Sequence, residues 1–117
     1  MLNVTPFCGR LWIIILFSGV SSMTAYAIFI RDKLTDPAEF QAYSDTVGET
    51  FKGHPAKILA AYGKQEKLEG IEPDGVVIIE FPDIASARAW YDSPEYQAAA
   101  KHRWKAASYN VVIVEGV

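Results

Sequence analysis

Cysteine, histidine and clustered basic residues are all scarce in this chain of 117 residues. Cys8 is the single cysteine, so neither an internal disulfide nor a cysteine-built zinc site can form. The two histidines, His54 and His102, lie far apart without the spacing of metal ligands, and we expect no metal site. The formal net charge is −3 and no basic run occurs. We therefore expect neither a nucleic-acid partner nor a membrane partner for residues 23–117, since both require clustered lysine and arginine.

A long apolar run is also missing, although residues 1–22 contain a short one. Arg10 precedes the apolar segment 11–17, and small residues follow it, which is the shape of a signal peptide. A membrane-spanning helix would need about 20 apolar residues. The alternative, which we favour, is that Met23 is the true start and residues 1–22 are a misassigned extension. We expect one domain, residues 23–117, in the cytoplasm, or in the periplasm or outside the cell if the signal peptide is real.

The rest of the chain alternates between segments typical of strands and of helices. Four segments rich in β-branched and aromatic residues predict strands, at 24–31, 57–64, 76–81 and 109–115. Three segments with helical spacing or capping signals predict helices, at 36–51, 84–91 and 94–107. The order β-α-β-β-α-β, with the second helix broken, predicts an α+β domain whose four-stranded antiparallel sheet carries its helices on one face.

Two helix starts carry the same signal, a polar cap followed by proline. Asp36 can cap the first helix, Pro37 suits its first position, and Glu39 can reach back to complete a capping box. Ser93 precedes Pro94 in the same way. We therefore interpret Ser93 as a helix cap and not as a nucleophile.

The predicted sheet is apolar on both faces. A strand with one wet face should alternate apolar and polar residues, but strands 24–31, 76–81 and 109–115 place apolar side chains on both sides. Helices cover one face only, and soluble monomers avoid a bare apolar patch on the other. Burying each large side chain stabilises by about 1.5–3 kcal/mol, so several outweigh an association cost of about 4–15 kcal/mol. We expect a homodimer that packs sheet against sheet.

Two motifs carry a resemblance to a known family: Val77-Ile78-Ile79-Glu80-Phe81-Pro82 and Trp90-Tyr91-Asp92-Ser93-Pro94-Glu95-Tyr96-Gln97. Leu68-Glu69-Gly70, Arg103 and Val114-Glu115-Gly116 also fit. On these motifs the chain resembles the domain-of-unknown-function 1330 family over residues 23–117. The resemblance implies a ferredoxin-like subunit and a dimeric α+β barrel, and it implies no established activity.

Arg103 is the most informative charge, because it shares a helical face with Tyr96 and small apolar residues. A buried guanidinium needs an acid or an anion. We favour an internal pair with Glu80, and the alternative is a small ligand's carboxylate held by the guanidinium fork. Glu80 is also a candidate general base if burial raises its pKa, and His54, in a turn, is a second catalytic candidate. Tyr91 and Tyr96 are candidate donors to a ligand, or core residues with satisfied hydroxyls.

Three functions fit these residues. The first is a cofactor-free enzyme acting on a small organic acid, in a pocket between helices and sheet lined by Tyr96, Arg103 and Glu80. The second is a module that binds a small carboxylate without turnover, and the third is a purely structural homodimer. An RNA-recognition domain shares the strand order, but its basic and aromatic strand signature is missing. We further expect His102 to face solvent and Trp90 to pack in the core.

Overall fold

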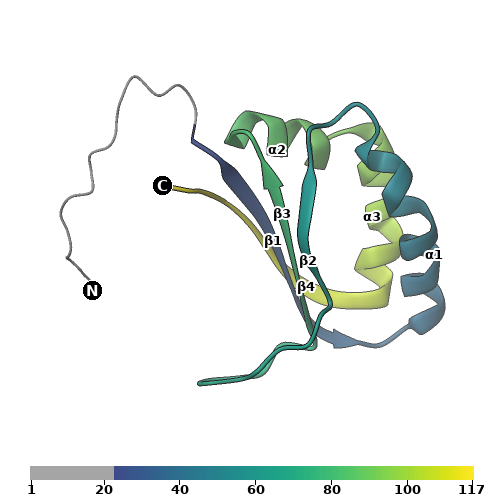
Figure 1. Ribbon diagram of the computed structural model, residues 1–117. Helices are drawn as coiled ribbons and strands as arrows, with labels where there is room; N and C mark the ends of the chain where they lie inside the picture. Colours follow the sequence, from purple (N-terminus) through teal and green to yellow (C-terminus); the bar gives the residue numbers. More distant parts are fainter. Residues whose placement is uncertain (1–22) are drawn as a thin grey trace.

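The computed structural model describes residues 23–117, which form a sheet of four strands backed by three α-helices (Figure 1). The strands are β1 (Ala25–Leu34), β2 (Lys57–Ala61), β3 (Gly75–Phe81) and β4 (Ala107–Glu115). The α-helices are α1 (Pro37–Val47), α2 (Ile84–Tyr91) and α3 (Pro94–Ala106), and a short 3-10 helix, η2 (Gly48–Phe51), follows α1. The signal-like segment 1–22 lies outside the described residues.

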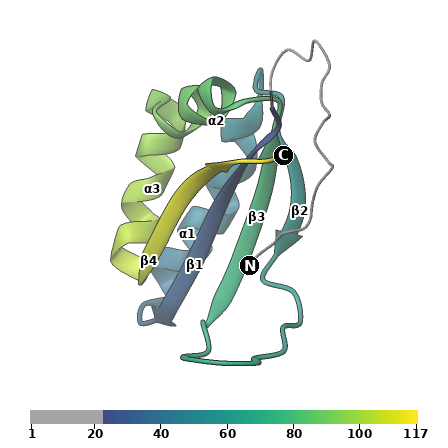
Figure 2. The same ribbon diagram turned by 90° about the vertical axis from the view of Figure 1, so that its left-hand side faces the viewer.

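The strands follow the order β2-β3-β1-β4 in the sheet, and each pairs antiparallel with its neighbours. All three helices lie on the same face (Figure 1), and Figure 2 looks onto the opposite, open face. This is the βαββαβ arrangement of a ferredoxin-like α+β domain. The fold class predicted from the sequence is therefore confirmed.

Helix starts follow the predicted capping pattern. A carboxylate oxygen of Asp36 accepts a hydrogen bond from the backbone N–H of Glu39 at 3.2 Å, with Pro37 as the first residue of α1. The Ser93 hydroxyl oxygen accepts from the backbone N–H of Tyr96, also at 3.2 Å, and Pro94 opens α3. Satisfying an otherwise free amide explains why these helices begin where they do. Ser93 is a helix cap, as predicted.

The predicted capping box is wrong in its second half. The Glu39 side chain turns away from the helix start, and its Oε1 lies 2.6 Å from Nδ1 of His102. The His102 side chain is 41% exposed, so it faces solvent in part, as predicted, while its ring nitrogen contacts α1. The error over Glu39 arises because the contact between α1 and α3 is tertiary and leaves no local pattern in the sequence.

Several element boundaries differ from the prediction. β1 continues to Leu34, and β4 begins directly at Ala107. β2 ends at Ala61 and not at Lys64, because Tyr62 has φ 58°, a left-handed backbone conformation that breaks an extended strand. The first helix tightens into η2 after Val47.

Alternate residues of each strand lie on the two faces of the sheet, one covered by the helices and the other open. On the helix-covered face of β1, Ala25, Ala27 and Phe29 are buried, and Trp90 lies in the same core at 0 % exposure, as predicted. The other face stays open along all four strands. Its apolar side chains are Tyr26, Ile28, Ile30, Ala60, Val76, Ile78, Val112 and Val114. Within residues 23–117, no helix has the length and apolar character needed to cross a membrane.

Candidate functional site

Arg103 lies at the centre of a buried aromatic cluster between α3 and the sheet. It is only 2 % exposed. Its Nε donates a hydrogen bond at 3.1 Å to the hydroxyl of Tyr96, two turns earlier on the same face of α3. Its guanidinium carbon lies 5.3 Å from the ring centroid of Phe29 and 4.8 Å from that of Tyr109. Aromatic faces thus supply the electron density that a buried cation requires.

The predicted ion pair between Arg103 and Glu80 is not formed. In the antiparallel register Glu80 lies opposite Tyr26 and Lys57, on the open face of the sheet, whereas Arg103 lies under the helices. The reason is the two-residue period of a strand: Glu80 shares the side of Ile78, and the buried Ile79 and Phe81 occupy the other. Among residues 23–117, no carboxylate lies within ion-pair distance of Arg103.

The hydroxyl of Tyr96 contacts Tyr43 of α1 as well as Arg103. The two phenol oxygens lie 3.0 Å apart in a buried hydrogen bond. The Tyr96 oxygen accepts from Arg103, and in the bond between the two phenols either hydroxyl can be the donor. When Tyr96 donates, polarisation by the cation strengthens the bond and the Tyr43 proton is free for a further acceptor. Arg103, Tyr96 and Tyr43, hereafter the Arg–Tyr–Tyr chain, form a continuous hydrogen-bonded series.

The protonation states of the chain favour donation over proton abstraction. Burial raises the pKa of the Tyr43 phenol far above its ordinary value, and the neighbouring Tyr96 adds to this effect. Burial likewise raises the pKa of Tyr96, although Arg103 pulls it part of the way back. Burial alone would lower the pKa of Arg103, but its phenol neighbours, Tyr96 first, outweigh that and the pKa is raised. Both phenols are therefore neutral and the guanidinium is charged near neutral pH.

An apolar cavity of about 100 Å³ lies between α1, η2 and the sheet, on the helix-covered side. Tyr43, Tyr62 and Trp90 contribute to its wall. Apolar side chains complete it: Phe29, Val47, Phe51, Ile58, Ala61, Val77 and Ile79. The cavity occupies the predicted region, but Tyr96 and Arg103 stand behind its wall, and Glu80 is on the other side of the sheet. Tyr43 is the member of the Arg–Tyr–Tyr chain that lines the cavity.

The remaining two candidates stand apart from this chain. Tyr91, the last residue of α2, is half-buried with its ring centroid 5.3 Å from that of Tyr96, and no hydrogen bond within residues 23–117 involves its hydroxyl. His54 follows η2 in a turn, held by a bond from its backbone N–H to the carbonyl of Phe51 at 2.9 Å. Neither side chain contributes to the cavity wall.

Two tyrosines that the sequence reasoning did not single out as site residues, Tyr43 and Tyr62, line the cavity. Phe40, Tyr43 and Val47 recur at helical spacing in the sequence, so the position of Tyr43 on the core face is predictable and its hydroxyl contact is not. Tyr62 falls within the predicted strand 57–64. Its left-handed conformation leaves no clear sequence signal, since glycine is the usual residue there.

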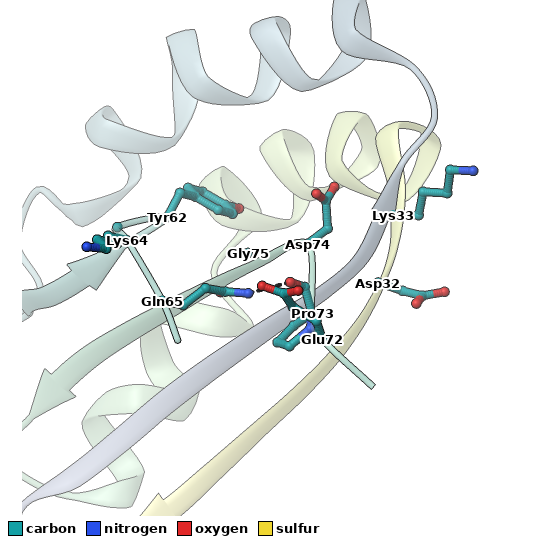
Figure 3. A pocket seen from close by; sticks show the side chains of 10 residues that line it. Asp32, Lys33, Tyr62, Lys64, Gln65, Glu72, Pro73, Asp74 and Gly75 are labelled. Atoms are coloured by element: carbon teal, nitrogen blue, oxygen red, sulfur yellow. Dashed lines mark hydrogen bonds between the residues drawn. The ribbon is translucent and has the colours of Figure 1, made fainter. Parts of the chain in front are cut away.

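A second, polar space lies outside the cavity, at the end of the sheet where β3 begins (Figure 3). This groove has a volume of about 590 Å³. One wall is fastened by Asp74, whose Oδ2 accepts from Nε of Arg31 at 3.1 Å and from the backbone N–H of Leu34 at 2.8 Å. Its other lining residues are Asp32, Lys33, Tyr62, Gly63, Lys64, Gln65, Glu72, Pro73 and Gly75. Acidic and basic side chains are mixed along it, so it favours no single sign of charge.

Side chains suited to binding metal do not gather in the described part of the chain. Within residues 23–117, no three His, Cys, Asp or Glu side chains come together in a group that could hold an ion. The chemistry available at the cavity is therefore hydrogen bonding from phenols, backed by one buried cation.

Comparison with known proteins identifies the family. The model of the family described as "Domain of unknown function (DUF1330)" matches residues 24–117. The chain belongs to the DUF1330 family. This confirms the resemblance seen in the sequence motifs. No curated protein matches the chain.

Solved structures similar to this DUF1330 protein show the same fold. A protein of unknown function from Rhodopseudomonas palustris has 21% identity and a TM-score of 0.63, covering 83% of this chain and 85% of its own. A dimeric ferredoxin-like protein of unknown function from Thermobifida fusca has 16% identity and a TM-score of 0.55, covering 82% and 92%. SnoaB, a cofactor-independent oxygenase from Streptomyces nogalater, has 12% identity and a TM-score of 0.57, covering 83% and 95%. At these identities the likeness concerns the fold alone.

Proposed function

We propose that this DUF1330 protein binds a small, largely apolar organic acid or carbonyl compound in the cavity between α1 and the sheet. The observation that carries the proposal is the Arg–Tyr–Tyr chain, which ends on a phenol in the wall of an apolar cavity. Ligand sites typically combine apolar walls with a few oriented polar groups. Tyr43 donates to the ligand's oxygen, and the cation behind it stabilises negative charge there without entering the cavity.

The volume limits the ligand to a small molecule. An engineered apolar cavity of about 150 Å³ holds benzene, so a cavity of about 100 Å³ suits a short aliphatic acid whose polar end reaches Tyr43 better than it suits an aromatic ring. The wall includes Ile58, which is 54% exposed, so the cavity lies close to the surface there.

A panel of short carboxylates, including butanoate and benzoate, tests this proposal by calorimetric titration and thermal shift. We expect at least one acid to bind wild type, and Tyr43→Phe to weaken it about tenfold, as for the loss of one hydrogen bond to a charged group. Tyr91→Phe is the matched control, since its hydroxyl lies outside the donor chain, and it should bind as wild type does. If no acid binds, or if both variants bind equally, the assignment of Tyr43 is wrong.

A second candidate function is turnover of the bound compound without a cofactor. Donors aimed at a developing oxyanion are a main source of catalysis in enzymes, and the Arg–Tyr–Tyr chain is such a group. SnoaB, which shares the fold, is a cofactor-independent oxygenase. The cavity wall holds no carboxylate, imidazole or amine to take a proton, so a substrate acidic enough to ionise by itself is required. Oxygen uptake with acidic phenols and β-dicarbonyl compounds tests this, and Tyr43→Phe should abolish any uptake found.

We also propose that the working unit is a homodimer formed through the open sheet face. Its eight apolar side chains have no cover within residues 23–117, and Val112 and Val114 are 45% and 44% exposed. The loop 62–74 leaves on the same side of the sheet (Figure 1) and carries Leu68 and Ile71 at 87% and 92% exposure. The T. fusca neighbour is described as dimeric. Light scattering at micromolar concentration should give twice the chain mass, and a monomer there would contradict the dimer.

A further inference from the structure

Tyr62 is the one side chain that lines both the apolar cavity and the polar groove. Figure 3 shows it at the side of the groove, with its ring directed over the start of β3. Tyr62 is thus the residue that the linings of the two spaces share.

The backbone of Tyr62 is held in an unfavourable conformation to place the ring there. Its φ of 58° is the only positive value at a non-glycine residue within residues 23–117. For a bulky residue such a conformation is strained, and strain of this kind concentrates at functional sites. A hydrogen bond from the Tyr62 N–H to the carbonyl of Val76, 2.9 Å long, ties the residue to β3. Gly75 leaves room for the ring, because a Cβ there would collide with Cδ1 of Tyr62.

Three side chains fix the ring in this place. The guanidinium of Arg31 lies 4.7 Å from the ring centroid, and Phe40 meets the ring edge-on at 5.4 Å. The hydroxyl bonds to that of Tyr109 at 2.7 Å. Arg31 is itself anchored by Asp74. With its ring stacked, its edge packed and its hydroxyl bonded, Tyr62 is a rigid wall and not a surface side chain free to rotate.

We propose that Tyr62 is a specificity-determining residue, a partition that limits ligands to the cavity and excludes chains long enough to reach the groove. This inference rests on the ligand site proposed above. It adds a size rule: wild type takes short acids, and a variant without the ring takes longer amphipathic acids whose further end lies in the groove. The groove suits such an end because its lining mixes both charges with backbone groups.

Tyr62→Gly tests the partition, because glycine removes the ring and adopts the positive φ without strain. Tyr62→Phe is the matched control, since it keeps the ring and loses only the hydroxyl. Calorimetric titration with butanoate and 8-aminooctanoate, whose far end is polar, should give butanoate binding in all three proteins. Binding of 8-aminooctanoate should be at least about tenfold tighter in Tyr62→Gly than in wild type or Tyr62→Phe.

A second readout does not depend on any acid. Trp90 lines the cavity, and Trp12→Phe with Trp104→Phe leaves it as the only tryptophan. Acrylamide should quench Trp90 about twofold or more strongly when Tyr62→Gly opens the cavity to the groove, as expected when a wholly buried ring becomes accessible. Tyr62→Phe should leave quenching unchanged.

The two readouts separate the possible failures. Tighter binding of 8-aminooctanoate and increased quenching in Tyr62→Gly support the partition. Butanoate binding to wild type without either change overturns the partition and leaves the ligand site standing. If no acid binds any protein, the ligand site falls, and quenching alone decides whether Tyr62 separates the two spaces. Circular dichroism confirms that each variant is folded.

Discussion

The two faces of the sheet are built from the same strands and differ in nearly everything else. The helix-covered face holds the buried aromatic cluster, the only fully buried cation within residues 23–117, and the cavity. The open face holds aliphatic side chains and the half-buried Glu80, with no comparable hydrogen-bond chain among them. The difference shows that a shift of one residue along a strand moves a side chain from one face of the sheet to the other. The proposals above place assembly on the open face and ligand binding on the covered one.

The largest expected effect comes from a charge placed in the open face. Ile78→Glu puts a carboxylate at the centre of the proposed interface, beside Glu80 and opposite Ile28. An unpaired charge there costs several kcal/mol on association, so we expect a monomer at micromolar concentration by light scattering. Ile84→Glu, at the exposed start of α2, is the matched control and should remain dimeric. A dimeric Ile78→Glu protein would mean that assembly uses another surface.

On the covered face the largest effect should follow truncation of Arg103. Arg103→Ala removes the bond to Tyr96 and the contacts with two rings, and leaves a hole. We expect a loss of about 3–5 kcal/mol in the free energy of unfolding, as for other large core truncations. Because no carboxylate is left unpaired, Arg103→Met should lose only about 1–3 kcal/mol. Lys105→Ala, exposed on the same helix, should change stability by less than about 0.5 kcal/mol.

Urea unfolding of the three Arg103 and Lys105 variants makes this comparison. Equal losses for Arg103→Met and Arg103→Ala would show that the charge, and not the packing, holds the cluster together.

A smaller effect is expected at Thr50, another buried polar contact of the covered face. The indole N–H of Trp90 donates to its hydroxyl at 3.0 Å, and the hydroxyl donates to the carbonyl of Val47 at 2.6 Å. Thr50→Val keeps the shape and leaves the indole N–H unsatisfied, which should cost about 1–3 kcal/mol in the free energy of unfolding. Thr46→Val, on the exposed side of α1, should cost less than about 0.5 kcal/mol. Similar losses in the free energy of unfolding at Thr50 and Thr46 would contradict the claim that polar groups buried under the helices contribute more to stability than exposed ones.

The comparison also shows how far the sequence leads. Helix caps at Asp36 and Ser93, the broken second helix and the bare apolar face all have local or periodic signals, and each was predictable. The position of Glu80 is predictable too, because it falls in step with Ile78 on the open face. The predicted pair of Glu80 with Arg103 conflicts with that two-residue period. The aromatic rings that satisfy Arg103 come from β1 and β4.

Contacts between elements distant in sequence could not be predicted. The hydroxyl bond of Tyr43 with Tyr96 and the pair of Glu39 with His102 both depend on how α1 packs against α3. The left-handed turn at Tyr62 depends on the empty space above Gly75 and on Arg31 across the sheet. None of these leaves a periodic or capping signal, and the contacts of Tyr43 and Tyr62 belong to the candidate site.

The separation of the two faces is tested most directly by titrating butanoate into the Ile78→Glu monomer. The cavity and the Arg–Tyr–Tyr chain are built from one chain alone, so the account predicts an affinity within about twofold of that of the wild-type dimer. Loss of butanoate binding in a folded monomer would contradict it, because the ligand site would then need the partner subunit.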